Sequence, residues 1–448
     1  MKRRAISLIA ALVLATTVSA QDQKLKDEAA SVYPQVRALY EDLHAHPELS
    51  AHETRTAALV AERLRALGYE VTEHVGGTGV VGILKNGAGP TVMLRTELDA
   101  LPVEEKTGLP YASKARTKND AGIEVGVMHA CGHDVHMSTL WGTAAIMMRT
   151  KDTWHGTLML IAQPAEETVG GADGMVADGL FTRFPKPDVG VALHDTNALP
   201  AGQVGITPEY ALTNADSVRI TVYGKGGHGA MPEATVDPIV IAAGIVLKLQ
   251  TIVSREIHPG DAAVVTVGYL NAGTKNNIIP DQAVMGLTVR SFKPEVRKHL
   301  LEAIARIAKG EAESGGAQKM PLVERLEGAN AVYNDPVLAR HLLPVLENAV
   351  GKGNAKIMPP WMASEDYSVY IEHGVPSFFF SLGVADPEKF RQAAASGNAL
   401  PSNHSPFFAP VEDPSLRVGV AAEVAVLRDL LKGTPADIAK ITEHKSGQ

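Results

Sequence analysis

The sequence is poor in cysteine and in aromatic residues. Its 448 residues include one cysteine, Cys131, and aromatic residues make up 5% of the chain. A single cysteine excludes an internal disulfide, so the core has to hold the fold together. A lone thiol is open to damage in an oxidising compartment, and we therefore expect Cys131 to be buried or bound to a metal.

Several functional signatures are also missing. The formal net charge is −8, with both signs scattered along the chain and no basic patch, so nucleic acid is not an expected partner. The sequence has neither the Gly-x-Ser-x-Gly elbow of serine hydrolases nor the His-Glu-x-x-His helix of zinc proteases. Both of these hydrolase classes are therefore disfavoured.

The first twenty residues are predicted to be a secretory signal peptide. Basic residues 2–4 precede an apolar run, residues 5–13, and small residues close the segment at 18–20. A membrane anchor is the alternative, but the apolar run is well short of the roughly 20 residues that a spanning helix needs. We expect cleavage after Ala20, export to the periplasm or the medium, and no membrane contact afterwards.

The remaining chain is long enough for two domains. In residues 21–212, β-type runs alternate with helical patterns, which is typical of an α/β domain with a mixed, mostly parallel sheet. The same pattern resumes in residues 329–448. Between them, residues 213–328 follow the order β-α-β-β-α-β of a ferredoxin-like α+β domain. We predict a catalytic α/β domain interrupted by this insertion.

Residue types that bind metals gather at the predicted strand ends. In open α/β sheets, ligands bind at the carboxyl ends of the strands. The residues at these ends are Asp99 after strand 91–95, Cys131 and His133 before helix 136–149, Glu166 and Glu167 after strand 157–162, His194 at the end of strand 189–193, and His404 after strand 377–382. Thiolate, imidazole and carboxylate together bind zinc, manganese, cobalt or nickel, and the sequence does not choose among them.

The adjacent pair Glu166 and Glu167 gives this cluster a catalytic interpretation. If one of them binds a metal, the other is free to take a proton from a metal-bound water. The metal lowers the pKa of that water and polarises a scissile carbonyl. The spacing Cys131-Gly132-His133 also lets two side chains reach one site, with a thiolate able to bridge two ions. The cluster therefore predicts a metal-dependent hydrolase.

Short motifs spread over most of the chain carry a family resemblance. In order they are Pro47-Glu48-Leu49-Ser50, Ala100-Leu101-Pro102, Met128-His129-Ala130-Cys131-Gly132-His133-Asp134-Val135-His136, Gln163-Pro164-Ala165-Glu166-Glu167, Gly226-Gly227-His228-Gly229-Ala230, Val236-Asp237-Pro238-Ile239 and His404-Ser405-Pro406. Together they resemble the aminoacylase and carboxypeptidase G family of dinuclear metallopeptidases. The nearest branch is that of hippurate hydrolases and indole-acetyl-amino-acid hydrolases.

This resemblance implies a role for each residue of the catalytic domain. Two divalent ions would be bound by Cys131, His133, Glu167, His194 and His404, with the Cys131 sulfur bridging them. Glu166 would be the general base and later the acid towards the leaving amine. Asp99 would orient a ligand through a hydrogen bond.

For residues 213–328 the resemblance implies a lid that pairs two chains into a homodimer. His228 would reach the site of the partner subunit and stabilise the oxyanion. Asn277 and Arg290 would hold the carboxylate of the substrate, which suits the planar fork of arginine.

A few positions depart from the pattern of this branch. Glu97-Leu98-Asp99 stands where Asp-Met-Asp is usual, and the stretch 116–124 is longer. Two further segments differ from the residues that are usual in this branch: Asp195-Thr196-Asn197 and Trp361-Met362-Ala363. We expect these changes to affect substrate preference rather than catalysis. His129 and His136 are expected to be structural neighbours of the ligands, and His44 an ordinary residue.

Three functions compete on this basis. The first is hydrolysis of N-acyl amino acids, such as hippurate-like conjugates. The second is a metallo-carboxypeptidase or dipeptidase with the same machinery. The third is a periplasmic peptide-binding protein, which is disfavoured because a binder does not need an unligated Glu166 beside a metal pair.

Overall fold

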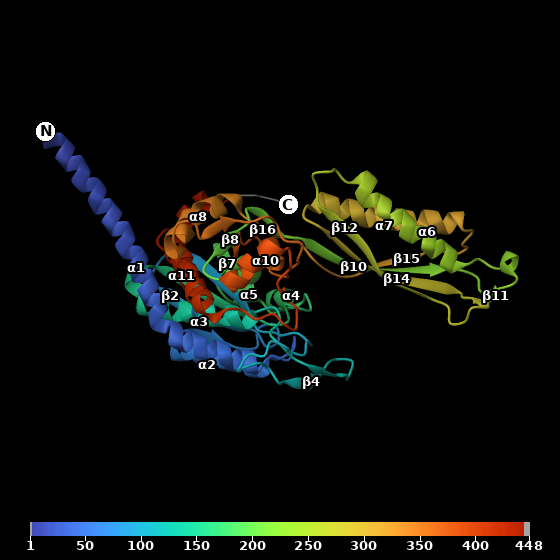
Figure 1. Cartoon of the computed structure of the whole chain (residues 1–448), viewed down its shortest axis with the longest axis horizontal. Coiled ribbons are helices and arrows are strands. Elements are labelled where there is room, and N and C mark those ends of the chain that lie inside the picture. Colours follow the sequence, from blue (N-terminus) through green and yellow to red (C-terminus); the bar gives the residue numbers. More distant parts are fainter. Residues whose placement is uncertain (1, 443–448) are drawn as a thin grey trace. The chain divides into compact units, whose positions relative to one another are not determined.

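The structure is a computed structural model that describes residues 2–442, with side chains described from residue 23 onward. The predicted signal peptide, residues 1–20, thus lies outside the residues whose side chains are described. The chain forms two compact units (Figure 1). Unit 1 comprises residues 1–209, 334–359 and 369–448, and unit 2 comprises residues 210–333 and 360–368.

Unit 1 is built on an eight-stranded sheet with the order β1-β2-β6-β3-β7-β18-β8-β17. The strands are β1 (Glu70–Thr72), β2 (Val80–Asn86), β3 (Thr91–Glu97), β6 (Gly156–Gln163), β7 (Val189–Pro200), β8 (Val204–Ile206), β17 (Ala355–Ile357) and β18 (Ser377–Ala385). The four central strands β6, β3, β7 and β18 run parallel, and β2 and β8 flank them antiparallel. Almost every residue of β18 is buried, because both faces of the sheet are covered. The mixed, mostly parallel sheet predicted from the sequence is confirmed.

Helices complete unit 1. They are α1 (Lys2–Ala45), α2 (Thr54–Ala66), α3 (His133–Arg149), α4 (Gly171–Ala177), α5 (Leu180–Arg183), α8 (Pro336–Val350), α9 (Ser368–Glu372), α10 (Pro387–Ser396), α11 (Glu412–Leu430) and α12 (Pro435–Lys440). Three of them, α1, α3 and α11, pack against one another. The caps follow the sequence: the Asp335 side chain accepts hydrogen bonds from the Val337 and Leu338 amides, and Pro336 takes the first position of α8.

Unit 2 contains a four-stranded antiparallel sheet and two long helices. Its elements are β10 (Asn214–Tyr223), β11 (Gly227–His228), α6 (Pro238–Thr251), β12 (Ala263–Ala272), β13 (Ile278–Ile279), β14 (Gln282–Ser291), α7 (Pro294–Ser314) and β15 (Leu322–Ala329). The order β12-β14-β10-β15 is that of a ferredoxin-like sheet. Burial alternates along β10, because only one face of the sheet is covered.

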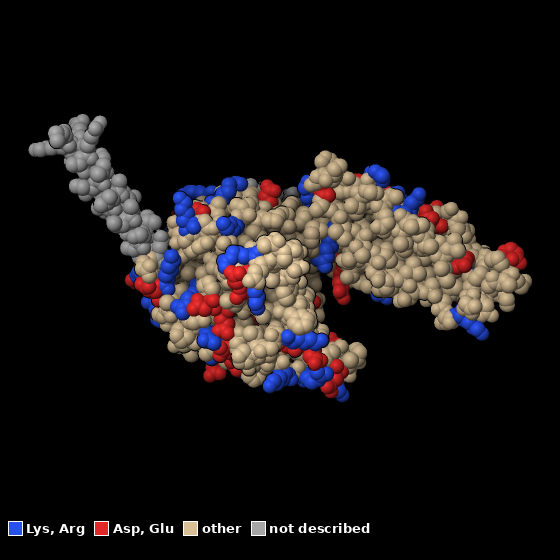
Figure 2. Space-filling model, in the orientation of Figure 1, with Lys and Arg blue, Asp and Glu red and all other residues tan. Residues whose placement is uncertain are grey.

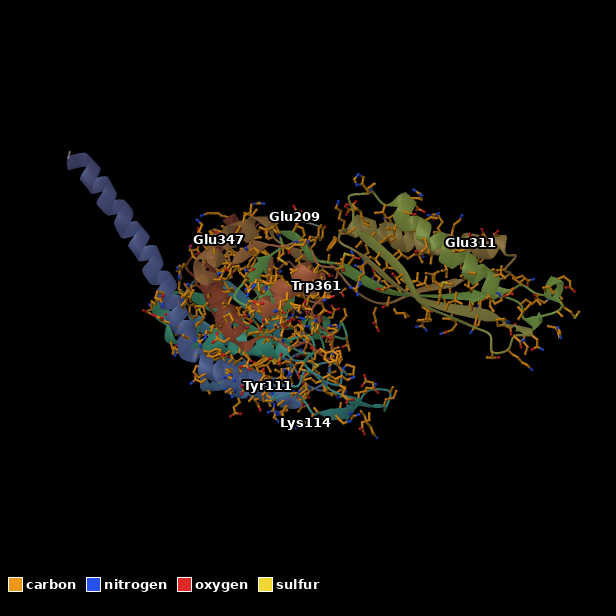
Figure 3. The ribbon with its side chains drawn as sticks, in the orientation of Figure 1. Tyr111, Lys114, Glu209, Glu311, Glu347 and Trp361 are labelled. Carbon is orange, nitrogen blue, oxygen red and sulfur yellow. The ribbon has the colours of Figure 1, made fainter. Side chains whose placement is uncertain are left out.

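The helices α6 and α7 pack closely in unit 2. A Cβ atom at Gly244 of α6 would lie 2.6 Å from Oε2 of Glu311, which is labelled on α7 in Figure 3. With its π-helical extension, Pro238–Glu256 is also the one helix among the described residues that is long and apolar enough to cross a membrane. It contacts strands of the unit 2 sheet, and 33% of the tested window is buried.

Charged side chains of both signs are mixed over the face of the molecule drawn in Figure 2. On that face unit 2 shows fewer charged side chains than unit 1. The pattern agrees with the scattered charges of the sequence.

Two boundaries near the predicted site differ from the prediction. The helix predicted from His136 begins at His133, because Gly132 adopts the left-handed φ of 84° that starts α3. The strand predicted to end at Leu193 continues to Pro200, because β18 keeps pairing with it after β3 has stopped. The long stretch 116–124 belongs to a hairpin of β4 (Arg116–Lys118) and β5 (Glu124–Gly126).

Candidate metal centre

The predicted metal-binding residues of unit 1 meet at one edge of the large sheet. The strands β3, β6, β7 and β18 are parallel, so their carboxyl ends share that edge. Three overlapping groups there have their candidate ligand atoms within 4.8 Å of one another: Cys131 with His133 and His194, Cys131 with Glu167 and His404, and His133 with Glu166 and Glu167. The five predicted ligands and Glu166 therefore form one continuous cluster.

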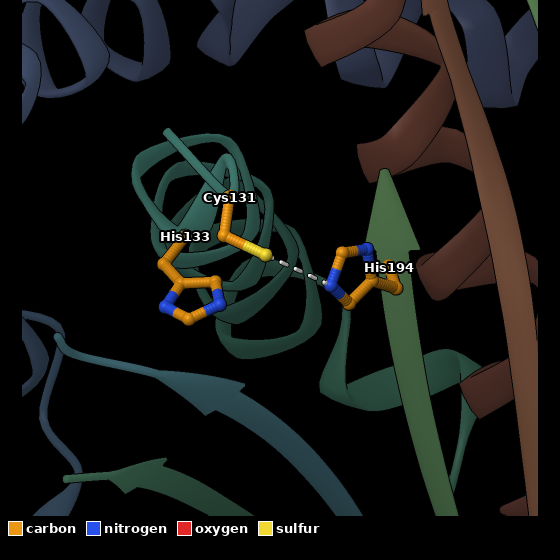
Figure 4. Close-up of side chains that lie close together, drawn as sticks. All are labelled: Cys131, His133 and His194. Atoms are coloured by element: carbon orange, nitrogen blue, oxygen red, sulfur yellow. Dashed lines mark hydrogen bonds between the residues drawn. The ribbon is translucent and has the colours of Figure 1, made fainter. Parts of the chain in front are cut away.

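Cys131 lies at the centre of the cluster. Its sulfur is 3.6 Å from Nε2 of His194 and 3.3 Å from Nε2 of His404 (Figure 4 shows the first contact). The Cys131 side chain is buried, and its loop is tied to the His404 loop because the His404 amide donates to the Ala130 carbonyl at 2.7 Å. The sulfur thus contacts imidazoles that come from two distant parts of the chain.

In two histidines, a hydrogen bond from Nδ1 to a backbone carbonyl fixes the orientation of the ring. Nδ1 of His133 donates to the backbone carbonyl of Asp99 at 2.8 Å, and Nδ1 of His194 donates to the backbone carbonyl of Asp195 at 2.8 Å. In the neutral form of each ring, the proton on Nδ1 leaves the lone pair on Nε2 for a metal ion. Among the described residues, Nε2 of His133 has no hydrogen-bond partner. Both Nε2 atoms are therefore available as ligands.

Asp99 is buried and contacts three segments. Its Oδ2 accepts from the Ser50 hydroxyl at 2.7 Å and from the Glu167 amide at 3.0 Å, and its Oδ1 lies 3.4 Å from Nδ1 of His133. Burial opposes ionisation, but these contacts outweigh it and lower the pKa of Asp99. The Asp99 carboxylate therefore positions both Glu167 and His133.

Each of the two glutamates lies close to a histidine of the cluster. Oε1 of Glu167 is 3.4 Å from Nε2 of His404, and Oε2 of Glu166 is 3.8 Å from Nε2 of His133. His404 has a φ of 69°, and a strained non-glycine backbone of this kind is common at functional sites. A carboxylate thus lies beside each of these two imidazoles.

The electrostatics of the cluster fit a divalent cation. Burial raises the pKa of the Cys131 thiol, and Glu167, Glu166 and Asp195 raise it further. Burial lowers the pKa of His133, but Asp99 and the nearby glutamates outweigh it and raise that pKa to about 10. A site so rich in negative charge stabilises a cation, and thiolate, imidazole and carboxylate are suitable donors for it.

Sequence analysis missed two buried groups near the cluster, Asp195 and His44. His136, by contrast, was expected to be a structural neighbour of the ligands, and its Nδ1 lies 2.8 Å from Oε2 of Glu97. Asp195 was noted only because it differs from the residue that is usual in this branch, yet it is completely buried beside His194. His44 was expected to be ordinary, but it is buried between Asp134 and Glu105. The position of Asp195 next to a predicted ligand was the one signal that could have identified it.

The predicted substrate residues lie in unit 2, His228 and Asn277 at the small β11–β13 sheet and Arg290 on β14 of the four-stranded sheet. His228 and Asn277 are close, because the Gly229 amide donates to the Asn277 carbonyl at 2.9 Å. Nδ1 of His228 accepts from the Ala230 amide at 3.0 Å, which leaves Nε2–H as a donor on an exposed ring. Arg290 lies near the other end of β14, about 26 Å along the strand from Gln282 at roughly 3.3 Å per residue. Its guanidinium donates to the Met362 carbonyl at 3.3 Å.

Comparison with known proteins gives a consistent family match. Residues 93–427 match the model of peptidase family M20/M25/M40. The hippurate hydrolase of Campylobacter jejuni is 38% identical over 332 residues, which cover 74% of this chain and 83% of that protein. Thermostable carboxypeptidase 1 of Saccharolobus solfataricus is 33% identical over 405 residues, covering 89% of this chain and 96% of that protein.

A solved structure agrees with this match. The YxeP protein of Bacillus subtilis, described as a dinuclear metal-binding peptidase of the M20 family, is 28% identical, with a TM-score of 0.74. The match covers 90% of this chain and 99% of that one.

Proposed function

This chain belongs to peptidase family M20/M25/M40 and is a metal-dependent hydrolase of amide bonds, and we propose that its substrates are N-acyl amino acids of the hippurate type. The name of the hippurate hydrolase relative supports this substrate class. In this proposal Cys131, His133, Glu167, His194 and His404 hold two divalent ions. The donor set suits zinc, manganese, cobalt or nickel.

When bound, the metal ions polarise the scissile carbonyl and lower the pKa of the attacking water. Glu166 takes one proton from that water as its oxygen forms a bond to the carbonyl carbon. The C–N bond then breaks, and Glu166 passes the proton to the leaving amine nitrogen. In the dimer proposed below, the partner subunit's His228 would offer its Nε2–H to the negative charge that develops on the carbonyl oxygen.

One observation carries the proposal: a buried second carboxylate, Glu166, lies beside the ligand cluster, 3.8 Å from Nε2 of His133. A protein that only binds peptides has no need of it. The substitution Glu166→Gln should lower kcat on hippurate by about 10²–10⁴-fold, the usual contribution of a general base. Metal content should not change, and Glu124→Gln, at an exposed position, should be fully active. Retained activity in Glu166→Gln would refute the assigned role.

Peptide hydrolysis is the second candidate function. The carboxypeptidase relative, matched over 89% of this chain, favours it. Parallel measurements of kcat/KM on N-acyl amino acids and on dipeptides with the same C-terminal residue separate the two. A higher kcat/KM for the dipeptides would favour the peptidase function.

We also propose that the chain forms a homodimer through unit 2. On α6, Leu247 is 74% exposed, and on the edge strand β12, Tyr269 is 47% exposed. An unpaired edge strand beside an exposed apolar helix favours pairing with a second copy.

Sedimentation of Leu247→Glu tests the dimer. The variant should sediment as a monomer, whereas Leu326→Glu, on the opposite edge strand β15, should remain dimeric. A dimeric Leu247→Glu would place the interface elsewhere.

Export remains part of the proposal, supported by the basic, apolar and small-residue segments of residues 1–20. Mass spectrometry of the periplasmic fraction should find a chain that begins at Gln21. An intact residue 1–20 segment on the isolated protein would contradict it.

A further inference from the structure

Asp195 is a buried carboxylate that contacts the metal-binding segments of unit 1. It follows His194 directly and has no exposed surface. Burying a carboxylate is costly unless its surroundings compensate for the charge. The contacts that compensate for the burial of the Asp195 carboxylate therefore indicate its role.

The first contact joins Asp195 to the His404 segment and to the Cys131 loop. Nδ2 of Asn403 donates to Oδ1 of Asp195 at 3.2 Å and to the Cys131 carbonyl at 3.1 Å. Asn403 immediately precedes His404. One amide group thus connects the loop of Cys131, the residue after His194 and the residue before His404.

The second contact is steric, at the residue between Cys131 and His133. A Cβ atom built on Gly132 would lie 2.3 Å from Oδ2 of Asp195, so the carboxylate fills the space that any other residue at this position would use. Gly132 also has a φ of 84°, which starts α3 and directs His133 into the cluster. The Asp195 carboxylate packs directly against the turn that separates two predicted ligands.

The backbone of Asp195 adds a third set of contacts. Its carbonyl accepts from Nδ1 of His194 at 2.8 Å, and its amide donates to Nε2 of His136 at 2.9 Å. Oδ1 lies 3.2 Å from the same His136 nitrogen. His136 in turn contacts Glu97, so Asp195 is anchored to α3 and to the end of β3.

From these contacts we propose that Asp195 is a positioning residue of the metal site. Its side chain holds the segments of Cys131, His133 and His404 in register around His194, and its charge favours the cation-loaded site. The inference rests on the proposed metal-dependent function. Asp195 itself takes no part in the proton transfers.

Two substitutions separate the shape of Asp195 from its charge. Asp195→Asn keeps an oxygen that can accept from Asn403 and removes the charge. Asp195→Ala removes both. Asp188→Ala is the matched control: Asp188 precedes the opposite end of β7 and accepts from the Thr91 amide at 2.7 Å. It lies about 20 Å from His194 at roughly 3.3 Å per residue, so its loss should not reach the site.

The test is a titration of the chelator-stripped full chain with Co²⁺, followed by visible absorption and by competition with a chromophoric chelator. In Asp195→Ala the Co²⁺ affinity should fall about 10–100-fold, as for other groups that orient metal ligands, and the ligand-field bands should shift. Asp195→Asn should lose affinity with a smaller shift of the bands. Asp188→Ala should match the wild type in both.

The same experiment separates this inference from the proposed function. If the wild-type chain binds no Co²⁺, the metal-dependent function fails. If the wild type binds Co²⁺ and both Asp195 variants keep its affinity within threefold and its spectrum, only the positioning role fails. Asn403→Ala adds an independent check, because its effect on affinity should not add to that of Asp195→Ala if both act on the His404 segment.

Discussion

Nδ1 of His44 lies 2.6 Å from Oδ2 of Asp134, in a buried ion pair that joins the last turn of α1 to the first turn of α3. Nε2 of His44 lies 3.1 Å from Glu105, and Tyr111 packs edge-on against the ring with centroids 5.3 Å apart. A cation at a helix C-terminus and an anion at a helix N-terminus both complement the helix dipoles. The pair thus fixes α1 against the helix that begins at His133.

The His44 pair predicts a loss of stability at alkaline pH. Burial lowers the pKa of His44, but Asp134 and Glu105 outweigh it and raise the pKa to about 10. The folded-state pKa is above that of the unfolded chain, so the stabilisation is complete below about pH 6.5 and is lost as the pH rises towards 10. Urea unfolding at pH 6, 8 and 10 should show this decline in the wild type and a weaker one in His44→Gln.

The exposed His46→Gln serves as the control for that series. At pH 6, His44→Ala should lower the free energy of unfolding by about 3–5 kcal/mol, because Asp134 loses its partner in a buried site. Equal pH slopes in the wild type and in His44→Gln would contradict the prediction.

Substitution of Glu423 should stabilise the fold, in contrast to substitution of His44. It is buried on α11, where it accepts from the Thr143 hydroxyl at 2.7 Å, and burial raises its pKa to about 8. Between about pH 4.5 and 8 the folded chain binds more protons here than the unfolded chain, so stability falls as the pH rises. One pKa unit corresponds to about 1.4 kcal/mol, so Glu423→Gln should be more stable than the wild type at pH 9 by several kcal/mol.

Thermal unfolding at pH 5 and pH 9 measures this gain. The two proteins should differ little at pH 5, and the exposed Glu302→Gln should change neither value. A Glu423→Gln protein that is less stable at pH 9 would show that the carboxylate is required there.

Cys131 gives a direct readout of metal occupancy, because it is the only thiol in the chain. With metal bound, we expect no reaction with a disulfide reagent at pH 7. After chelation the thiol should react slowly, since it is buried and its pKa is raised, and the rate should increase with pH. Activity should disappear in parallel and return with added metal. A reaction rate that is the same with and without metal would argue against the thiol as a ligand.

Gly142 predicts a packing effect at the contact of α1, α3 and α11. A Cβ atom there would lie 2.7 Å from methyl groups of both Val36 and Val420. Overpacking typically costs about 1–3 kcal/mol, which exceeds the roughly 1 kcal/mol that alanine gains over glycine in a helix. Gly142→Ala should therefore lower the midpoint of urea unfolding. Gly310→Ala on α7, with no atom within 4 Å of the added Cβ, should raise it.

The fold class could be predicted from the sequence because its signals are local. The apolar run of β18 and the alternation along β10 each report how many faces of a strand are buried. The ends of helices and strands were harder to predict from the sequence. The start of α3 at His133 depends on a left-handed glycine and on the Asp99 carbonyl, and neither leaves a periodic pattern.

The sequence by itself determined the residue types of the site and their places at strand ends, because metal chemistry and sheet topology restrict both. Only the tertiary structure decided which of these side chains meet. Cys131 and His404 are 273 positions apart, and their contact depends on the order of strands in the sheet and on the path of the loop after β18. The same holds for Asp195 and His44, whose partners come from other segments: a buried charge is recognisable only once the groups that surround it are known.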